Sequence, residues 1–204
     1  MARTPDDDGS VITLAPSRIS QQRAYAWSHE RAWAGVGSGD VAAYVGAMQA
    51  ETDARVRLRH GVDLLPTLVH GCHHASITTV RDGRLTVRFA TDSTGRRADE
   101  LQDELDEGPA LQAVRTGHGV VAHDLRHETR WVSWCRATVA ELDVTGALSV
   151  LLVAHTRPLA TLNLYSDIAE GLGSLDLAQL HLLAAPLTEA LLDANAPDRL
   201  GPAA

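Results

Sequence analysis

The residues with the richest chemistry stand together in the segment His70-Gly71-Cys72-His73-His74. Thiolate and imidazole are the ligands that zinc prefers in proteins. If this segment enters a regular strand, His73 and His74 point to opposite faces and cannot both bind one ion. No second Cys or His pair follows at zinc-finger spacing. We therefore predict no metal site and interpret the segment as a polar turn before a strand, with metal binding as the open alternative.

Three further features of the sequence bear on catalysis. His123 and His127 have the spacing of two ligands on one helix, but they follow a strand and lack the glutamate of a metalloprotease motif. Cys72 and Cys135 are too few for a disulfide framework and are expected to be free thiols. The sequence contains no serine-hydrolase, phosphate-loop or dinucleotide motif. These observations predict a protein that is not an enzyme.

The charge distribution excludes several partners. The net charge is −8, and residues 101–204 carry fourteen acidic residues against six arginines. Nucleic-acid binding needs clustered cations, so we predict no direct contact with nucleic acid. The acidic run at 99–107 is typical of a solvated helix face, and a docking surface for a basic partner is the alternative. No apolar stretch has the length of a membrane span or a secretory signal, which predicts a cytoplasmic protein without membrane contact.

Hydrophobic periodicity places these residues on an α+β scaffold. Asp82-Gly83 lies between two alternating segments and predicts a tight hairpin in which Leu85, Val87 and Phe89 share a face. The apolar run at 147–153 indicates a central strand. The order of elements favours one mostly antiparallel sheet with helices on its faces. Helices are predicted at 18–34, 41–59, 61–71, 98–107, 109–116, 133–142 and 174–193, and strands at 76–80, 85–89, 120–122, 147–153 and 159–165.

Four segments, at 100–117, 120–131, 146–153 and 159–166, resemble GAF domains in order and spacing. The resemblance covers about residues 60–195 and is closest to the actinobacterial GAF domains that precede an ANTAR RNA-binding domain. Asp106 and Ala110 stand where such proteins commonly have Gly and Cys. No ANTAR-like segment is expected after the last helix.

The resemblance implies a GAF-like fold, related to PAS domains, with helices on both faces of a central antiparallel sheet. It also implies a sensory or regulatory function in transcription or signal transduction, with an unidentified small-molecule ligand and a homodimer, and it leaves a regulatory protein partner open. A degenerate GAF fold that serves as an interaction scaffold is the alternative. Free methionine sulfoxide reductases are GAF proteins too, but Cys72 and Cys135 do not reproduce their cysteine set. We predict a disordered tail at 1–17, helices for dimerisation or linkage at 18–59, a GAF domain at 60–195 and a second tail at 196–204.

The ligand is predicted to lie between the sheet and the segment 99–135. The terminal helices carry long apolar stripes and should cover one face of the sheet completely. The other face is left to short helices and loops, which fill space poorly. Core packing is the alternative interpretation of the two tryptophans in this set. The predicted ligand-binding residues are Ser76, Thr78, Ser149 and Asn163 on the strands, with apolar walls from Phe89, Leu105, Trp131 and Trp134.

Overall fold

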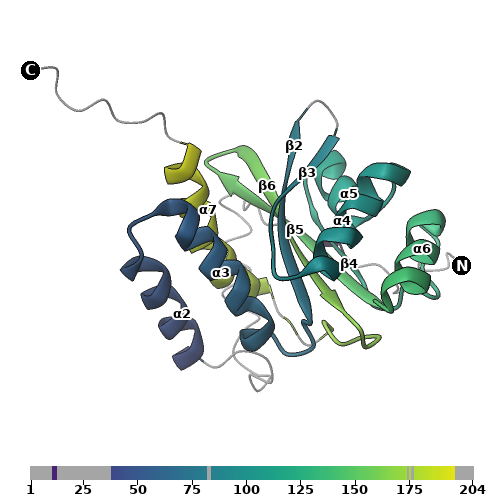
Figure 1. Ribbon diagram of the computed structural model, residues 1–204, viewed down its shortest axis with the longest axis horizontal. Coiled ribbons are helices and arrows are strands. Elements are labelled where there is room, and N and C mark those ends of the chain that lie inside the picture. Colours follow the sequence, from purple (N-terminus) through teal and green to yellow (C-terminus); the bar gives the residue numbers. More distant parts are fainter. Residues whose placement is uncertain (1–10, 13–37, 82–83, 174, 176, 196–204) are drawn as a thin grey trace, which may run out of the picture.

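A computed structural model describes residues 11–12, 38–81, 84–173, 175 and 177–195. In the described residues one antiparallel sheet stands between two groups of helices, α2, α3 and α7 on one side and α4, α5 and α6 on the other (Figure 1). The arrangement confirms the predicted α+β class with helices on both faces of the sheet. None of the described helices is both long enough and apolar enough to cross a membrane.

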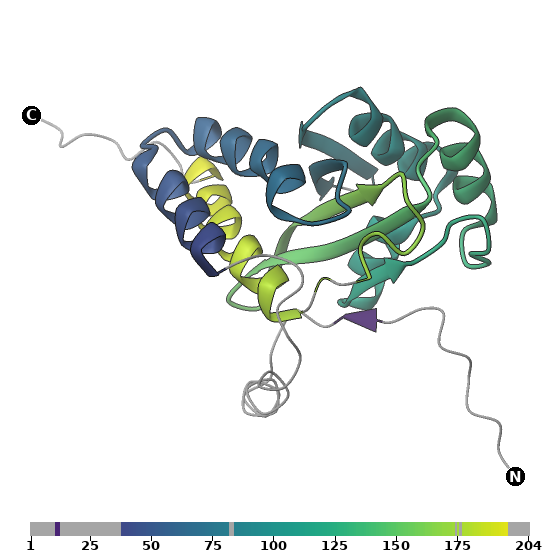
Figure 2. The ribbon, with the colours of Figure 1, turned by 90° about the horizontal axis from the view of Figure 1, so that it is seen from below.

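The sheet has the strand order β1-β4-β5-β6-β2-β3, and every neighbouring pair is antiparallel. The apolar segment predicted as central is β5, which has neighbours on both sides. The short strand β1 lies inside the tail that was predicted to be disordered; it pairs with β4 at the sheet edge (Figure 2). The strands are β1 Val11–Ile12, β2 His74–Arg81, β3 Arg84–Ala90, β4 Gly119–Ala122, β5 Gly146–Ala154 and β6 Arg157–Ser166.

The terminal helices α2 (Ser38–Ala50), α3 (Ala54–Leu68) and α7 (Leu177–Asn195) cover one face. The single helix predicted at 41–59 is wrong, because Asp53 ends the run and begins a new helix. Its carboxylate accepts hydrogen bonds from the amides of Arg55 and Val56 at 2.8 and 3.0 Å, which is an N-cap. The second helix then includes most of the segment that was predicted separately at 61–71 and ends at Leu68. Against this face the core is apolar.

The opposite face carries α4 (Ser93–Leu105), α5 (Pro109–Thr116) and α6 (Val132–Leu142). Pro109 begins α5 and Gly117 ends it with φ of 76°, as predicted. Ser133 was predicted to cap α6, but the helix begins at Val132, and Glu107 caps it instead. The Glu107 carboxylate accepts hydrogen bonds from the amides of Ser133 and Trp134 at 2.8 and 3.0 Å.

The hairpin of β2 and β3 has the predicted two-residue connection, since Arg81 pairs with Arg84. A β-bulge changes its faces. Ile77 pairs with Phe89 and Thr78 with Val87, so one residue of β3 is left over between these pairs. The extra residue turns Phe89 away from Val87 and onto the face of the terminal helices, where it packs against the apolar core. The prediction that Leu85, Val87 and Phe89 share a face is therefore wrong.

Some predictions fall on residues outside the described ranges. These are the helix at 18–34, most of the tail at 1–17, the tail at 196–204 and the two turn residues 82–83.

Candidate functional site

Polar side chains form two rows across the middle of the sheet, on the face under α4 and α5. Ser149, Asn163 and Ser76 are register partners on β5, β6 and β2. In the next row Thr161 pairs with Thr78, and their hydroxyl oxygens are 2.5 Å apart. All five side chains have no exposed surface. Apolar residues normally occupy such central positions, so these rows mark the sheet as specialised at this point.

Helix α4 adds a carboxylate and an amide to the rows. The Oδ1 atom of Asp99 accepts hydrogen bonds from the Tyr165 hydroxyl at 2.5 Å and the Asn163 amide at 3.0 Å. The Gln102 amide donates to the Tyr165 hydroxyl at 2.9 Å. Asp99, Gln102 and Tyr165 have no exposed surface. We call Ser76, Thr78, Asp99, Gln102, Ser149, Thr161, Asn163 and Tyr165 the buried polar cluster.

Asp99 is the electrostatic centre of the buried polar cluster. Within the described part of the chain its carboxyl makes no ion pair. Burial raises its pKa to about 7, against the opposing effect of the polar groups of Ser76, Tyr165 and Asn163. Burial and the Asp99 carboxylate together raise the pKa of Tyr165 well above its usual range. The cluster therefore holds an acid that changes its charge near neutral pH, with no cation beside it.

Several oxygens of the buried polar cluster lack a hydrogen-bond partner among the described residues. They are Oδ2 of Asp99, Oδ1 of Asn163 and Oγ of Ser149. The three residues are neighbours, because Ser149 is the register partner of Asn163, and the Asn163 amide nitrogen contacts Asp99. The native fold leaves few buried polar atoms unpaired, since each costs about 1–3 kcal/mol. Three such oxygens in adjacent residues distinguish this part of the core from the apolar face of the sheet.

The sequence holds α4 over this face through both of its ends. Asp92 caps the first turn of α4 by accepting a hydrogen bond from the Gly95 amide at 2.9 Å. The His74 ring lies between Asp92 and Asp167, with its two nitrogens 2.7 and 3.0 Å from their carboxylates. His74 thereby joins the beginning of α4 to β2 and to the end of β6.

At the other end, Gln102 connects α4 to α5. Its side-chain oxygen accepts a hydrogen bond from the Ala110 amide at 2.8 Å. Gly108 permits this contact, because its φ is 131° and a Cβ there would come within 2.4 Å of the Gln102 oxygen. Two residues before it in the connection, Asp106 has φ of 54°, a left-handed conformation that Gly adopts more readily than other residues.

The two predicted tryptophans pack beside α4. Their rings meet edge to face with centroids 6.1 Å apart, and both side chains are buried. The Trp134 indole donates to the carbonyl of Ala98, the residue before Asp99, at 3.0 Å. The Arg130 guanidinium lies over the Trp131 ring, 4.3 Å from its centroid. Trp134 is thus connected to the residue next to the buried polar cluster.

The structure brings together part of the predicted site. Ser76, Thr78, Ser149 and Asn163 face the segment 99–135, where the ligand was predicted. Trp131 and Trp134 lie in the core on the same side. Phe89 does not join them, because the β-bulge places it on the other face, under the Arg59 guanidinium. Leu105 ends α4 at the surface with 38% of its area exposed.

Four members of the buried polar cluster were not predicted as site residues from the sequence: Asp99, Gln102, Thr161 and Tyr165. Asp99 and Gln102 were hidden in an acidic run that was interpreted as a solvated face. A signal was present, since Ala98 and Leu101 beside them have the spacing of a buried helix face.

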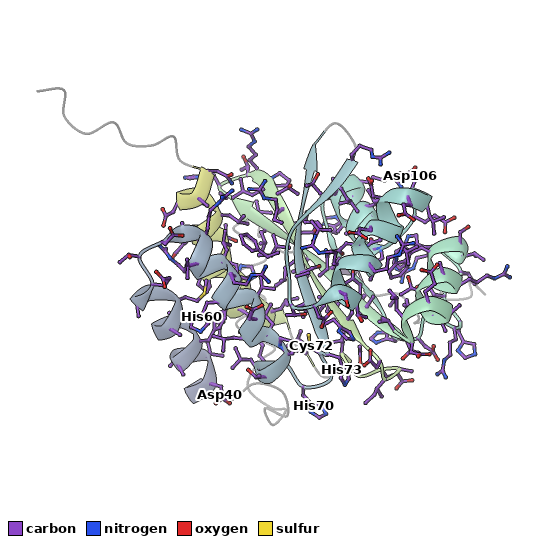
Figure 3. The ribbon with its side chains drawn as sticks, viewed as in Figure 1. Asp40, His60, His70, Cys72, His73 and Asp106 are labelled. Atoms are coloured by element: carbon purple, nitrogen blue, oxygen red, sulfur yellow. The ribbon has the colours of Figure 1, made fainter. Side chains whose placement is uncertain are left out.

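The His and Cys residues that opened the sequence analysis lie elsewhere. His70, Cys72 and His73 gather where α3 leads into β2 (Figure 3), beside a surface hollow of about 510 Å³. No three His, Cys, Asp or Glu side chains of the described residues are placed to hold a metal ion. Cys72 and Cys135 belong to the cores on opposite sides of the sheet. Burial raises the pKa of each thiol to about 12, so neither is a thiolate at neutral pH.

Comparisons with known proteins agree with this architecture. Residues 51–192 match the family model described as GAF domain. Type II free methionine-R-sulfoxide reductase from Thermoplasma acidophilum superposes with a TM-score of 0.56 at 15% identity, over 69% of this chain and 93% of that one. The GAF domain region of a membrane protein from Geobacter sulfurreducens PCA gives a TM-score of 0.55 at 18% identity, over 71% and 96% of the two chains. A comparison with curated proteins finds no match.

Proposed function

Since the chain belongs to the GAF domain family, we propose that it is a non-enzymatic sensory or regulatory module that binds a small molecule at the buried polar cluster. One observation carries this proposal: among the described residues, the fully buried Asp99 carboxyl has no ion pair, and one of its oxygens has no hydrogen-bond partner. A scaffold gains nothing from such a group, which costs stability. A binding site gains a strong, specific contact from it.

Access to the site requires α4 and α5 to move, because every member of the buried polar cluster lacks exposed surface. The moving parts are short, and polar contacts at both ends of α4 hold it in place. Asp103 near its C-terminal end accepts a hydrogen bond from the Leu85 amide at 2.8 Å and forms an ion pair with Arg84. Gln102 bonds to Tyr165 and to the Ala110 amide, and His74 holds the first turn of α4. Ligand entry would therefore be coupled to displacement of α4, and Trp134 would report that displacement through its bond to Ala98.

Native mass spectrometry of the freshly purified full chain tests the proposal. The expected result is a small molecule that stays bound in the native spectrum and dissociates when the ions are activated by collision. When it is added back to the chain, it should quench or shift tryptophan fluorescence. Trp134→Phe should remove most of the fluorescence change and leave binding nearly intact. Trp131→Phe is the matched control, because its ring has no hydrogen bond to α4. A chain that retains nothing, and whose fluorescence and melting temperature respond to no metabolite extract, contradicts the proposal and favours the scaffold.

We infer that the signal leaves through the terminal helices in a homodimer. The Tyr44 hydroxyl donates to the Leu183 carbonyl at 3.3 Å and ties α2 to α7. Leu182 and Leu192 of α7 remain 46% and 41% exposed, an apolar surface that a second copy would cover. Light scattering at micromolar concentration should give twice the chain mass, and Leu182→Asp with Leu192→Asp should return a monomer. A monomeric wild-type chain would contradict the dimer and leave ligand binding standing.

The reductase function of some structural neighbours is not favoured for this chain. Such chemistry needs a nucleophilic thiolate, and burial raises the pKa of both thiols far above neutrality. The two thiols also lie on opposite sides of the sheet, so they do not form a disulfide with one another in this fold.

A further inference from the structure

We infer that the ligand of the buried polar cluster is a compact molecule with a protonated amine or amidine group, which pairs with Asp99 and donates to Asn163. This inference rests on the proposed function and adds the chemical class of the ligand. The atoms of the cluster that lack a partner among the described residues are all oxygens. Oδ2 of Asp99 and Oδ1 of Asn163 are acceptors, and Oγ of Ser149 is a hydroxyl that accepts as well. A group with several N–H donors matches this set.

The orientation of Asn163 strengthens the assignment. Its amide nitrogen lies 3.3 Å from the Ser76 hydroxyl, 3.2 Å from the Thr78 hydroxyl and 3.0 Å from Asp99. The donor end of the amide is therefore committed to β2 and α4. The acceptor end is on the other side of the amide carbon and has no partner within the described ranges. A ligand without N–H or O–H donors would leave this oxygen and the Asp99 oxygen unsatisfied, at the full cost of two buried acceptors.

Charge disfavours an anionic ligand whenever the Asp99 carboxyl is ionised. Above pH 7 an anion next to Asp99 would meet a second negative charge in a buried site, where the two repel strongly. A cation instead restores the charged form of the carboxyl, which burial alone disfavours. In the described part of the chain no arginine or histidine supplies that cation, and the sequence contains no lysine. The counter-charge has to come with the ligand.

The pH dependence of binding gives an independent readout. Burial raises the pKa of Asp99 to about 7, and the other titratable groups that act on it are Tyr165 and Glu100. Primary amines stay protonated between pH 6 and 8, like a lysine side chain. The affinity for an amine should therefore rise by about tenfold from pH 6 to pH 8 as the carboxyl ionises.

The experiment compares amines with neutral molecules of the same shape on the full chain. Methylammonium, ethanolamine and 1,4-diaminobutane are titrated against methanol, ethylene glycol and 1,4-butanediol, and binding is followed by melting temperature and tryptophan fluorescence. We expect at least one amine to bind with an affinity tenfold or more above its neutral partner and to show the stated pH dependence. Asp99→Asn should abolish this preference, whereas Glu100→Gln, an exposed carboxyl on the same helix, should keep it.

The outcomes separate this inference from the proposed function. If native mass spectrometry releases a retained ligand without an amine or amidine, the ligand class is wrong and the binding function stands. If no amine is preferred over its neutral partner, or if Asp99→Asn keeps the preference while remaining folded, the inference is overturned. If the wild-type chain binds neither retained ligand, extract nor amine, both fall together.

Discussion

The two faces of the sheet solve the same packing problem in opposite ways. The face under α2, α3 and α7 is covered by an apolar core that includes Leu162, Leu164 and Leu187 without any exposed surface. The face under α4 and α5 contains the buried polar cluster, in which a carboxyl and several unpaired oxygens lie at the same depth. Alternate residues of one strand serve both, since Leu162 faces the terminal helices and Asn163 faces α4.

The two faces contribute differently to the stability of the fold. Apolar burial contributes stability at about 25 cal/mol per Å², while an unpaired buried polar atom subtracts about 1–3 kcal/mol. The terminal-helix face can therefore hold the fold together while the other face carries atoms that cost stability. Such local cost, when the rest of the chain offsets it, is typical of a functional site.

The largest expected effect is on the apolar face. Leu162→Ala removes a side chain with no exposed surface from the centre of β6 and should lower the free energy of unfolding by about 2–5 kcal/mol. Ile168→Ala is the control, because Ile168 is 60% exposed and its truncation should cost less than about 1 kcal/mol. Urea unfolding followed by circular dichroism measures both. A small effect of Leu162→Ala would mean that the terminal-helix face is not the main source of stability.

The second effect, with the opposite sign, belongs to Asp99. Burial raises its pKa to about 7, so the folded chain holds the proton more tightly than the unfolded chain. The stability that this difference provides is complete below about pH 4 and is lost as the pH rises through 7. Asp99→Asn keeps the shape without the charge and should raise the free energy of unfolding at pH 8 by about 1–4 kcal/mol.

Urea unfolding at pH 5 and pH 8 measures the contribution of Asp99. The wild-type chain and Glu100→Gln should both lose stability between these values, and Asp99→Asn should lose much less. Groups that titrate elsewhere contribute equally to all three chains and cancel in the comparison. If wild type and Asp99→Asn depend equally on pH, that result would contradict the assignment of Asp99 as a buried carboxyl without an ion pair and with a raised pKa.

How far the sequence predicts each face follows from the same contrast. Apolar periodicity predicted the strands on both sides and the helices α5 and α6 closely, because burying alternate or helically spaced residues is what shapes these elements. It joined α2 to α3, since apolar spacing runs through the break and only the cap by Asp53 separates them. It placed Phe89 on the wrong face, because a β-bulge depends on the pairing of two strands and cannot be recognised in the sequence of one strand alone.

The polar residues of this face were predicted from their residue types, but the contacts between them were not. Ser76, Thr78, Ser149 and Asn163 were identified as polar residues in central strands, where polarity is unusual. Asp99 was not, because a carboxyl in an acidic run is normally exposed and the rule that predicts exposure fails at this position. Which polar residue contacts which depends on the register of β2, β5 and β6 and on how α4 lies across them, and neither is contained in a local pattern.

A third, smaller effect concerns the junction that holds α4 over the polar face. His74→Ala removes the ring that contacts both Asp92 and Asp167 and should lower the free energy of unfolding by about 1–2 kcal/mol. His127→Ala is the control, because its side chain is 78% exposed and its contact with Asp124 should contribute less than about 0.5 kcal/mol. Hydrogen exchange should show faster opening of α4 in His74→Ala alone. Unchanged exchange in α4 would mean that the contacts of Asp99, Gln102 and Asp103 hold the helix without His74.

The smallest effect on stability separates the two roles of the polar face most clearly. Ser149 and Ser76 are both buried register partners of Asn163, but only the Ser76 hydroxyl accepts a hydrogen bond from it, at 3.3 Å. The Ser149 hydroxyl has no partner in the part of the chain that the structure describes. Ser149→Ala should leave the free energy of unfolding unchanged or raise it by up to about 1 kcal/mol, whereas Ser76→Ala should lower it by a similar amount. Any amine that binds wild type should bind Ser149→Ala more weakly, because the hydroxyl that costs stability in the free chain contacts the ligand in the complex. If Ser149→Ala is destabilised as much as Ser76→Ala, the Ser149 hydroxyl has a partner within the fold, and the polar face is a structural network like its apolar counterpart.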